Sequence, residues 1–211
     1  MDTSVAGVDV AGDRKGFHIV ILHGQRIVAC TRIREPEAIR SLCGQFHVHT
    51  VAVDAPSSWA PPHGPREAER ALSRLGLRYF LTPSEERARQ SRFYDWVRNG
   101  LRLYKELVEE YPLVCPGMKA GEAACCFETF PHAVASVVLG RPERWQEKWA
   151  ERRRALELVG VLSPLNLRNQ DEVDAALCAA MAWLWQRGQA ILLGDSAGGY
   201  IVLPSVQTSA G

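Results

Sequence analysis

The chain has 211 residues, of which 46% are hydrophobic and 23% are charged, and its formal net charge is +1. These values are typical of a globular protein that is large enough for one well-buried core, and they exclude a disordered or fibrous chain. A net charge so close to zero also excludes a surface that is basic all over, so any contact with nucleic acid would use a local basic face.

The six cysteines show no C-x-x-C spacing and have no histidine partners at the spacing of a zinc site. We expect free thiols in a reducing compartment and no structural zinc. The first residues lack the basic segment of a secretion signal, and no apolar run is long enough to span a membrane. The sequence therefore predicts a cytoplasmic protein with no membrane partner.

The first third of the chain predicts three neighbouring strands. An apolar run of small residues from Val5 to Gly12 predicts a buried strand that carries a single carboxylate, Asp9. Alternating apolar residues over 16–23 and 26–33, joined by a glycine turn, predict two further strands. Short connections of this kind are typical of an antiparallel meander.

A helix and a fourth strand are predicted next. Pro36 suits the first position of a helix and Gly44 suits its end, so we expect a short helix over 36–43. The fourth strand, over 50–53, leads directly into Asp54. Open α/β sheets form their sites at this carboxyl edge.

Several prolines after Asp54 indicate that the chain leaves the sheet for a helical insertion over 57–121. One helix is predicted over 65–75, and a second runs from a cap at Ser84 to the stop at Pro112. Apolar residues of the second helix recur every three to four positions, as one buried face requires: Phe93, Val97, Leu101, Tyr104 and Val108.

The last third predicts a return to the sheet within a single domain over 1–211. The expected elements are a fifth strand over 123–130, a charged amphipathic helix over 145–158, a mostly buried helix over 171–186, and closing strands over 191–193 and 200–203. The glycine-rich stretch 194–199 has no helix behind it, so it predicts a hairpin turn rather than a phosphate loop. Residues 205–211 are predicted to be a flexible tail.

Acids recur inside these apolar runs, at Asp9, Asp54, Glu128 and the pair Asp171 and Asp174. An ionised group buried without compensation costs several kcal/mol, on the order of 3 or more. Carboxylates gathered without histidine or cysteine favour Mg²⁺ or Mn²⁺ over zinc. Two alternatives remain open: Asp9 can accept hydrogen bonds from a backbone turn, and Asp171 can cap its helix.

The order of elements, with acids on the first strand, the fourth strand and the last helix, resembles that of the ribonuclease H-like fold. The D-x-x-D-A run that starts at Asp171 resembles the last-helix motif of RuvC-type Holliday-junction resolvases. Five motifs spread over nearly the whole chain resemble the domain of unknown function 429 family, which is labelled a predicted nuclease: Gly7-Val8-Asp9, Val53-Asp54-Ala55-Pro56, Arg66-Glu67-Ala68-Glu69-Arg70, Glu128-Thr129-Phe130-Pro131-His132 and Asp174-Ala175-Ala176.

This resemblance implies an α/β fold, in which a ribonuclease H-like mixed sheet of three antiparallel strands followed by parallel strands carries a helical insertion between strands 4 and 5. It also implies a metal-dependent nuclease with Mg²⁺ or Mn²⁺. The catalytic acids would be Asp9, Asp54, Glu128, Asp171 and Asp174, and the metal ligands Asp9, Asp54, Asp174 and Glu128. Glu128 is additional to the resolvase set: it can be a ligand, a group behind the ligands, or a structural acid held by the helix of Arg66 and Arg70.

Candidate substrate contacts are basic residues and one histidine: Arg66, Arg70, Lys15 and His132. Arginines with interleaved aromatic residues in the insertion can track phosphates and stack bases of nucleic acid, although a solvated helix surface over core aromatics fits the same pattern. A second basic face lies over 144–154. His132 can protonate a leaving group or can simply start a helix.

Two other functions fit the sequence. Asp9-Val10-Ala11-Gly12 with Lys15 and Gly16 resembles the first phosphate loop of the actin and sugar-kinase superfamily, which would make the protein a phosphoryl-transfer or nucleotide-binding enzyme. That superfamily closes two domains on a nucleotide, so this chain would need a homodimer or a helical cap. A non-catalytic interaction module that binds through the inserted helices is the third possibility.

Overall fold

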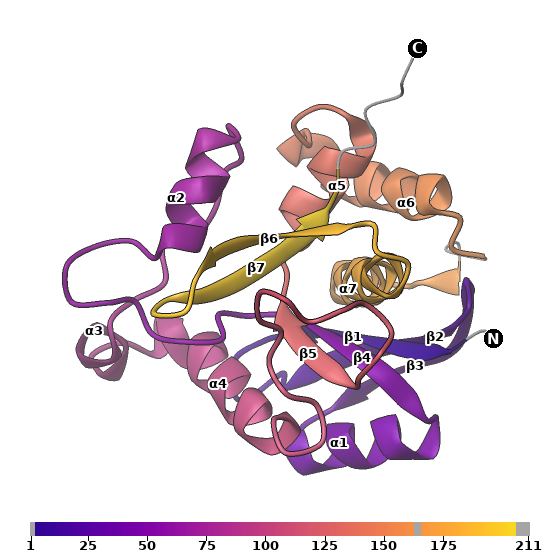
Figure 1. The fold of residues 1–211 in the computed structure, drawn as a ribbon, viewed down its shortest axis with the longest axis horizontal. Coiled ribbons are helices and arrows are strands. Elements are labelled where there is room, and N and C mark those ends of the chain that lie inside the picture. Colours follow the sequence, from indigo (N-terminus) through magenta and orange to yellow (C-terminus); the bar gives the residue numbers. More distant parts are fainter. Residues whose placement is uncertain (1–2, 163–165, 206–211) are drawn as a thin grey trace.

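The computed structural model describes residues 3–162 and 166–205 of the chain (Figure 1). A seven-stranded sheet has the order β3-β2-β1-β4-β5-β7-β6. Its strands are β1 (Ser4–Val10), β2 (Phe17–His23), β3 (Arg26–Ile33), β4 (Val48–Asp54), β5 (Cys125–Glu128), β6 (Ala190–Asp195) and β7 (Gly199–Pro204). The first three form the predicted antiparallel meander, and β4, β5 and β7 continue the sheet in parallel with β1. This mixed sheet confirms the predicted α/β class and is consistent with a ribonuclease H-like arrangement.

Helices cover both faces of the sheet. In Figure 1 the strands β1, β4 and β5 run between α7 on one side and α1 and α4 on the other. The α-helices are α1 (Pro36–Gln45), α2 (Glu67–Arg74), α3 (Glu85–Arg89), α4 (Asp95–Leu107), α5 (Pro131–Leu139), α6 (Lys148–Val159) and α7 (Gln170–Gln186). The helices α5 and α6 pack with α7, whereas α2 packs on β6 and β7. The helical insertion between strands 4 and 5 is therefore present, as α2 to α4.

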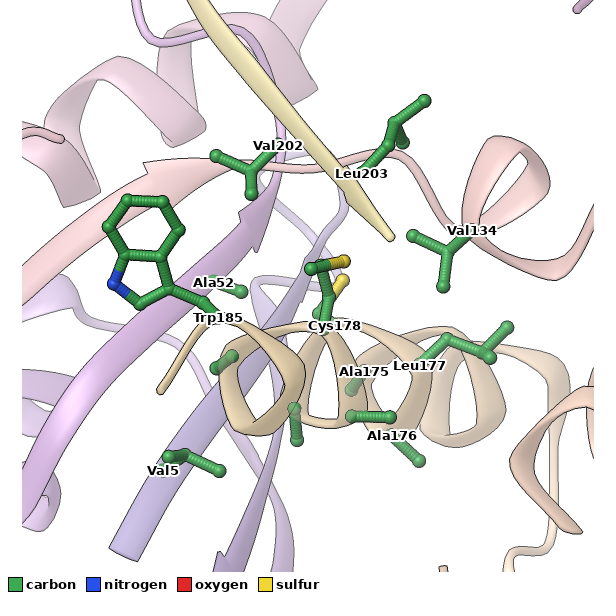
Figure 2. Close-up of a cluster of buried hydrophobic side chains, with 14 of the residues drawn as sticks. Val5, Ala52, Val134, Ala175, Ala176, Leu177, Cys178, Trp185, Val202 and Leu203 are labelled. Atoms are coloured by element: carbon green, nitrogen blue, oxygen red, sulfur yellow. The ribbon is translucent and has the colours of Figure 1, made fainter. Parts of the chain in front are cut away.

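The core divides between the two faces because strand side chains alternate. Val5 and Ala52 belong to the cluster under α7, where they meet helix residues such as Ala175 and Trp185 (Figure 2). The alternate residues of β1 and β4, whose side chains point to the opposite face, belong to the cluster under α1 and α4. By the same alternation, the acids that follow Val5 and Ala52 at even spacing, Asp9 and Asp54, face α7.

Gly7 allows α7 to lie directly on β1. A Cβ atom added at Gly7 would stand 2.0 Å from the Ala179 backbone nitrogen and 2.1 Å from the Ala175 carbonyl oxygen. The helix itself presents small side chains at the contact, including Ala175, Ala176 and Ala179. This close approach brings the first turns of α7 over the end of β1, where Asp9 lies.

The insertion differs from its prediction because its long helix is broken. Ser84 caps only the short α3, and its Oγ accepts a hydrogen bond from the Arg87 backbone at 3.3 Å. Ser91 then takes an extended conformation and restarts the chain as a 3₁₀ turn, Arg92–Tyr94, before α4. Two residues assigned to the buried face are exposed: Phe93, in the 3₁₀ turn, at 62%, and Val108, just past the end of α4, at 37%.

Other boundaries shift by a few residues. The helix predicted over 36–43 continues through Gly44 to Gln45, and α5 after β5 was not predicted as a helix. The hairpin between β6 and β7 is confirmed, since the Asp195 carboxylate accepts hydrogen bonds from the backbone of Ala197 and Gly198. Of the predicted tail, residues 206–211 lie outside the described residues. Within the described part of the chain, no helix combines the length and apolarity needed to cross a bilayer.

Candidate metal centre

Asp9 and Asp54 end neighbouring strands at the same level. They are register partners of the parallel strands β1 and β4, and both side chains face α7. Asp171 and Asp174 lie in the first turns of α7, which the contact at Gly7 holds above β1. Four of the five acids predicted for the site are thereby brought together.

Asp9 carries the strongest electrostatic signature of this group. Burial raises its pKa well above the ordinary value, and the nearby carboxylates of Asp54, Asp174 and Asp171 raise it further. Lys148 acts in the opposite direction but does not cancel the effect. A raised pKa of this kind means that too little positive charge lies nearby to stabilise the ionised carboxylate.

Asp54 is in a similar state. Burial, followed by repulsion from Asp174, raises its pKa to about 7, against the attraction of Arg152 and Lys148. Among the described residues, neither Asp9 nor Asp54 has an ion-pair partner within 4 Å. Both carboxylates can therefore accept a cation without losing a salt bridge.

Asp174 already has cationic partners. Arg152 donates to one carboxylate oxygen, the Lys148 Nζ lies 3.4 Å from the other, and Gln170 donates at 2.7 Å. The guanidinium of Arg152 is buried and also donates to Glu143 at 2.9 Å and 3.1 Å. Asp174 is thus oriented and neutralised by α6, which places the second basic face next to the acids.

Glu143 extends this network to His132. Burial alone would raise the pKa of Glu143, but hydrogen bonds with His132 and Arg152 lower it below its ordinary value. The contact uses the Nδ1 atom of His132, so only the other ring nitrogen can serve a substrate. The prediction singled out His132 but missed Glu143, which has no apolar run or motif around it.

Asp171 does not cap α7. The cap is Asn169, whose side chain accepts a hydrogen bond from the Glu172 backbone at 2.9 Å. Asp171 instead faces Lys15, at 3.5 Å from Nζ, and His18, at 3.7 Å from Nδ1. The alternative of a capping role is therefore wrong, and Asp171 belongs to the acidic cluster.

His18 joins this cluster from β2. It is the register partner of Asp9, and one ligand atom each from Asp9, His18 and Asp171 lie within 4.8 Å of one another. Burial, despite the nearby Asp171, lowers the pKa of His18, which favours the neutral imidazole. The sequence reasoning assumed a site without histidine. The available signal was the position of His18 across a tight hairpin from Asp9.

Glu128 is near enough to Asp54 for its charge to raise the pKa of that acid, but its carboxylate is held by other partners. It shares its side of β5 with Cys126, which packs in the cluster of the α1 and α4 face. Arg66 binds both of its carboxylate oxygens, at 2.5 Å and 2.7 Å, and the Ser57 backbone donates at 2.9 Å. Of the three roles considered for Glu128, this geometry favours the structural acid.

The two substrate contacts that were predicted in the insertion, Arg66 and Arg70, pair with acids of the protein itself. Arg66 is only 2% exposed and is held by Glu128 and Glu69, so it cannot reach a substrate. Arg70 is exposed but pairs with Glu67 at 2.8 Å, on a helix that packs against β6 and β7. These two arginines therefore stabilise the insertion rather than approach the acidic cluster.

A cleft opens on the acids from the side of α6. It has a volume of about 1020 Å³, and its walls include Asp54, Asp174, His132, Lys148, Arg152, Arg78, Arg144, Phe80 and Trp145. A second cleft of about 780 Å³ is lined by Lys15, the ion-pair partner of Asp171, together with Gly12, Asp13, Arg14, Arg92, Phe93, Asp95, Trp96 and Arg98. Both clefts combine cationic and aromatic side chains.

Comparison with known proteins gives one match. No curated protein and no solved structure matches the chain. The model of one family matches residues 7–197, a range that contains the whole acidic cluster and all of the strands except β7 and the first residues of β1. The chain therefore belongs to the family described as Protein of unknown function (DUF429).

Proposed function

We propose that this protein is a metal-dependent nuclease that hydrolyses phosphodiester bonds of DNA or RNA. The observation that carries the proposal is the convergence of the buried Asp9 and the half-buried Asp54, two carboxylates without ion-pair partners in the described structure, beside a cleft with basic and aromatic walls. The first feature suits a divalent cation and the second suits a nucleic-acid strand.

The residues of the cluster fit a divalent ion. Asp9 and Asp54 offer oxygen ligands whose charge is unneutralised, and Asp171 is countered mainly by the exposed Lys15. Such oxygen donors suit Mg²⁺ or Mn²⁺. When bound, these ions activate a water molecule and stabilise the leaving oxygen of a phosphodiester.

The cleft residues can hold the substrate. Lys148 and Arg152 reach Asp174 and also line the cleft, so a phosphate brought next to the acids would meet two cations. Trp145 is 70% exposed and Phe80 is 45% exposed, which makes both rings available for base stacking. His132, fixed by Glu143, is positioned on the same wall for proton transfer.

The test uses end-labelled single-stranded DNA and RNA, an RNA:DNA hybrid and a four-way junction, each with Mg²⁺, Mn²⁺ or a chelator. We expect cleavage of at least one substrate that requires metal and is lost in both Asp9→Asn and Asp54→Asn. Glu109→Gln is the matched control, because Glu109 is an exposed acid beyond the end of α4. Cleavage that survives chelation or Asp9→Asn would contradict the proposal, as would no cleavage of any substrate.

The second cleft favours one other function, nucleotide binding with phosphoryl transfer. The turn after β1 is tight, with the Gly16 backbone donating to Gly12 at 3.0 Å, and its residues Gly12 and Lys15 line the cleft with Arg92. A phosphate bound by Lys15 in this cleft would lie near Asp171, because Lys15 is the ion-pair partner of that acid. Thermal stabilisation by ATP and Mg²⁺ that is lost in Lys15→Ala would support this function, and an unchanged melting temperature would exclude it.

A further inference from the structure

The cluster of Asp9, His18 and Asp171 has the form of a small metal site built from three elements. Asp9 comes from β1, His18 from β2 and Asp171 from α7, and one ligand atom of each lies within 4.8 Å of the others. The β1 and β2 partners are fixed by backbone register, so their separation does not depend on flexible loops. Sites on rigid elements hold their ligands more closely than sites on loops.

His18 gives an independent indication that something binds here. The residue is 8% exposed, and its Nδ1 atom is shielded from solvent and has no hydrogen-bond partner in the described part of the chain. A buried polar atom left unpaired costs about 1–3 kcal/mol. The nearest carboxylate oxygen, on Asp171, is 3.7 Å from Nδ1, which is too far for a hydrogen bond but close enough for both atoms to contact one cation.

Lys15 occupies the approach to Asp171 without closing it. Its Nζ lies 3.5 Å from the same carboxylate oxygen that faces His18, and its side chain is 65% exposed. Exposed ion pairs of this kind contribute only about 0–1 kcal/mol. Lys15 can therefore serve as a counter-ion for Asp171 in the metal-free protein and move into solvent when a cation binds.

We propose that His18 is a ligand of the metal centre and that its imidazole makes the centre select Mn²⁺ over Mg²⁺. The inference rests on the proposed function and names the class of cation that this function uses. Mg²⁺ prefers an all-oxygen octahedral shell, whereas imidazole nitrogen is a common ligand of first-row transition ions. A site of two carboxylates and one imidazole therefore favours the transition ion.

The test measures binding of Mn²⁺ and Mg²⁺ by isothermal titration calorimetry, without a substrate. We expect the wild type to bind Mn²⁺ more tightly than Mg²⁺, and His18→Gln to weaken Mn²⁺ binding by about tenfold or more while Mg²⁺ binding changes far less. His23→Gln is the control, since His23 is an exposed histidine on the same strand. Retention of full Mn²⁺ affinity in His18→Gln would overturn the inference.

A second readout needs no variant and covers the case in which His18→Gln does not fold. Electron spin-echo modulation of Mn²⁺ bound to the wild type should show a directly coordinated ¹⁴N nucleus. Bound Mn²⁺ without nitrogen coupling would overturn the inference and leave the nuclease proposal standing on the acids. Failure of the wild type to bind either ion would overturn the metal-dependent nuclease itself.

Discussion

Asp9 and Asp54 are register partners on parallel strands, and among the described residues neither carboxylate has an ion-pair partner. Burial raises the pKa of both groups, and each carboxylate is repelled by others of the cluster, so the metal-free protein keeps protons that an exposed acid would release. The lack of compensating positive charge at Asp9 and Asp54 suits the binding of a cation. In the metal-free protein it also makes the free energy of unfolding depend on pH.

The first prediction concerns the pH dependence of that stability. The pKa of Asp54 rises from 3.8 to about 7 on folding, so between these pH values the folded state binds a proton that the unfolded chain has lost. The free energy of unfolding must then fall as the pH rises through this window. Asp54→Asn removes this loss. We therefore expect the free energy of unfolding of the metal-free variant to exceed that of the wild type by about 1–3 kcal/mol at pH 8, but by much less at pH 4.

Urea unfolding in the presence of a chelator measures the effect at both pH values. Glu109→Gln, an exposed acid, should leave the wild-type pH dependence unchanged. A difference between wild type and Asp54→Asn that stays constant from pH 4 to pH 8 would show that Asp54 titrates normally.

The second prediction tests the contact that places α7. In Gly7→Ala the new methyl group would collide with the backbone of Ala175 and Ala179, which cannot rotate away as a side chain can. We expect a loss of about 2–4 kcal/mol in unfolding free energy, together with weaker metal binding because Asp171 and Asp174 move with the helix. The readouts are urea unfolding and calorimetric titration with Mn²⁺.

Gly44→Ala is the matched control for this substitution. Gly44 lies within α1, and a Cβ atom added there would meet no atom of residues 3–162 or 166–205 within 4 Å. Because alanine has the higher helix propensity, we expect this variant to gain about 0.5–1 kcal/mol. Equal effects of the two substitutions would show that α7 does not depend on the close approach at Gly7.

Local patterns were sufficient to predict the strands and the acids that they carry, whereas the parallel part of the sheet was implied by the resemblance to the ribonuclease H-like fold. Apolar runs and their turn residues located the strands, and the ends of β1 and β4 placed Asp9 and Asp54 at one edge. The first turns of α7 added Asp171 and Asp174. These predictions succeeded because each depends on a period of two or of 3.6 residues within one segment.

The rest of the site depends on contacts between distant segments. His18 reaches the acids through strand register, and Arg152 reaches Asp174 through the packing of α6 on α7 and also binds Glu143. The side of the sheet on which Glu128 lies also follows from register, since β5 has only four residues. No periodicity within a segment carries this information.

The third prediction concerns the arginine that neutralises two acids. Arg152→Met would leave Glu143 and Asp174 buried without their main cation, although Lys148 would remain 3.4 Å from Asp174. Removing one partner of a buried ion pair costs about 3–5 kcal/mol, and we expect a loss in that range. Chemical denaturation at pH 7 measures it.

Arg154→Met provides the control on the same helix. Arg154 is exposed, and among the described residues its one ion-pair partner is Glu157, so we expect a change of less than about 1 kcal/mol. Adding Asp174→Asn to Arg152→Met should restore part of the lost stability, because it removes one of the uncompensated charges. A double variant as unstable as the single one would mean that Arg152 acts through packing rather than charge.

The last prediction distinguishes a structural acid from a metal ligand by the effects of their substitution on stability and on Mn²⁺ affinity. Glu128→Gln removes a charge that binds both ends of the buried Arg66 guanidinium, so we expect a stability loss of about 2–4 kcal/mol and little change in Mn²⁺ affinity. Asp9→Asn removes a charge that is repelled by its neighbours. We expect it to stabilise the metal-free protein while it abolishes Mn²⁺ binding.

Thermal melting with chelator and calorimetric titration with Mn²⁺, applied to both variants, decide between the roles. A lower melting temperature with retained Mn²⁺ affinity in Glu128→Gln, and a higher melting temperature with lost Mn²⁺ affinity in Asp9→Asn, would assign Glu128 to the fold and Asp9 to the metal centre. If Glu128→Gln instead lost Mn²⁺ binding while keeping its melting temperature, Glu128 would have to turn from Arg66 toward the ion. That movement would break the ion pair with Arg66, which holds both carboxylate oxygens of Glu128 in the present structure.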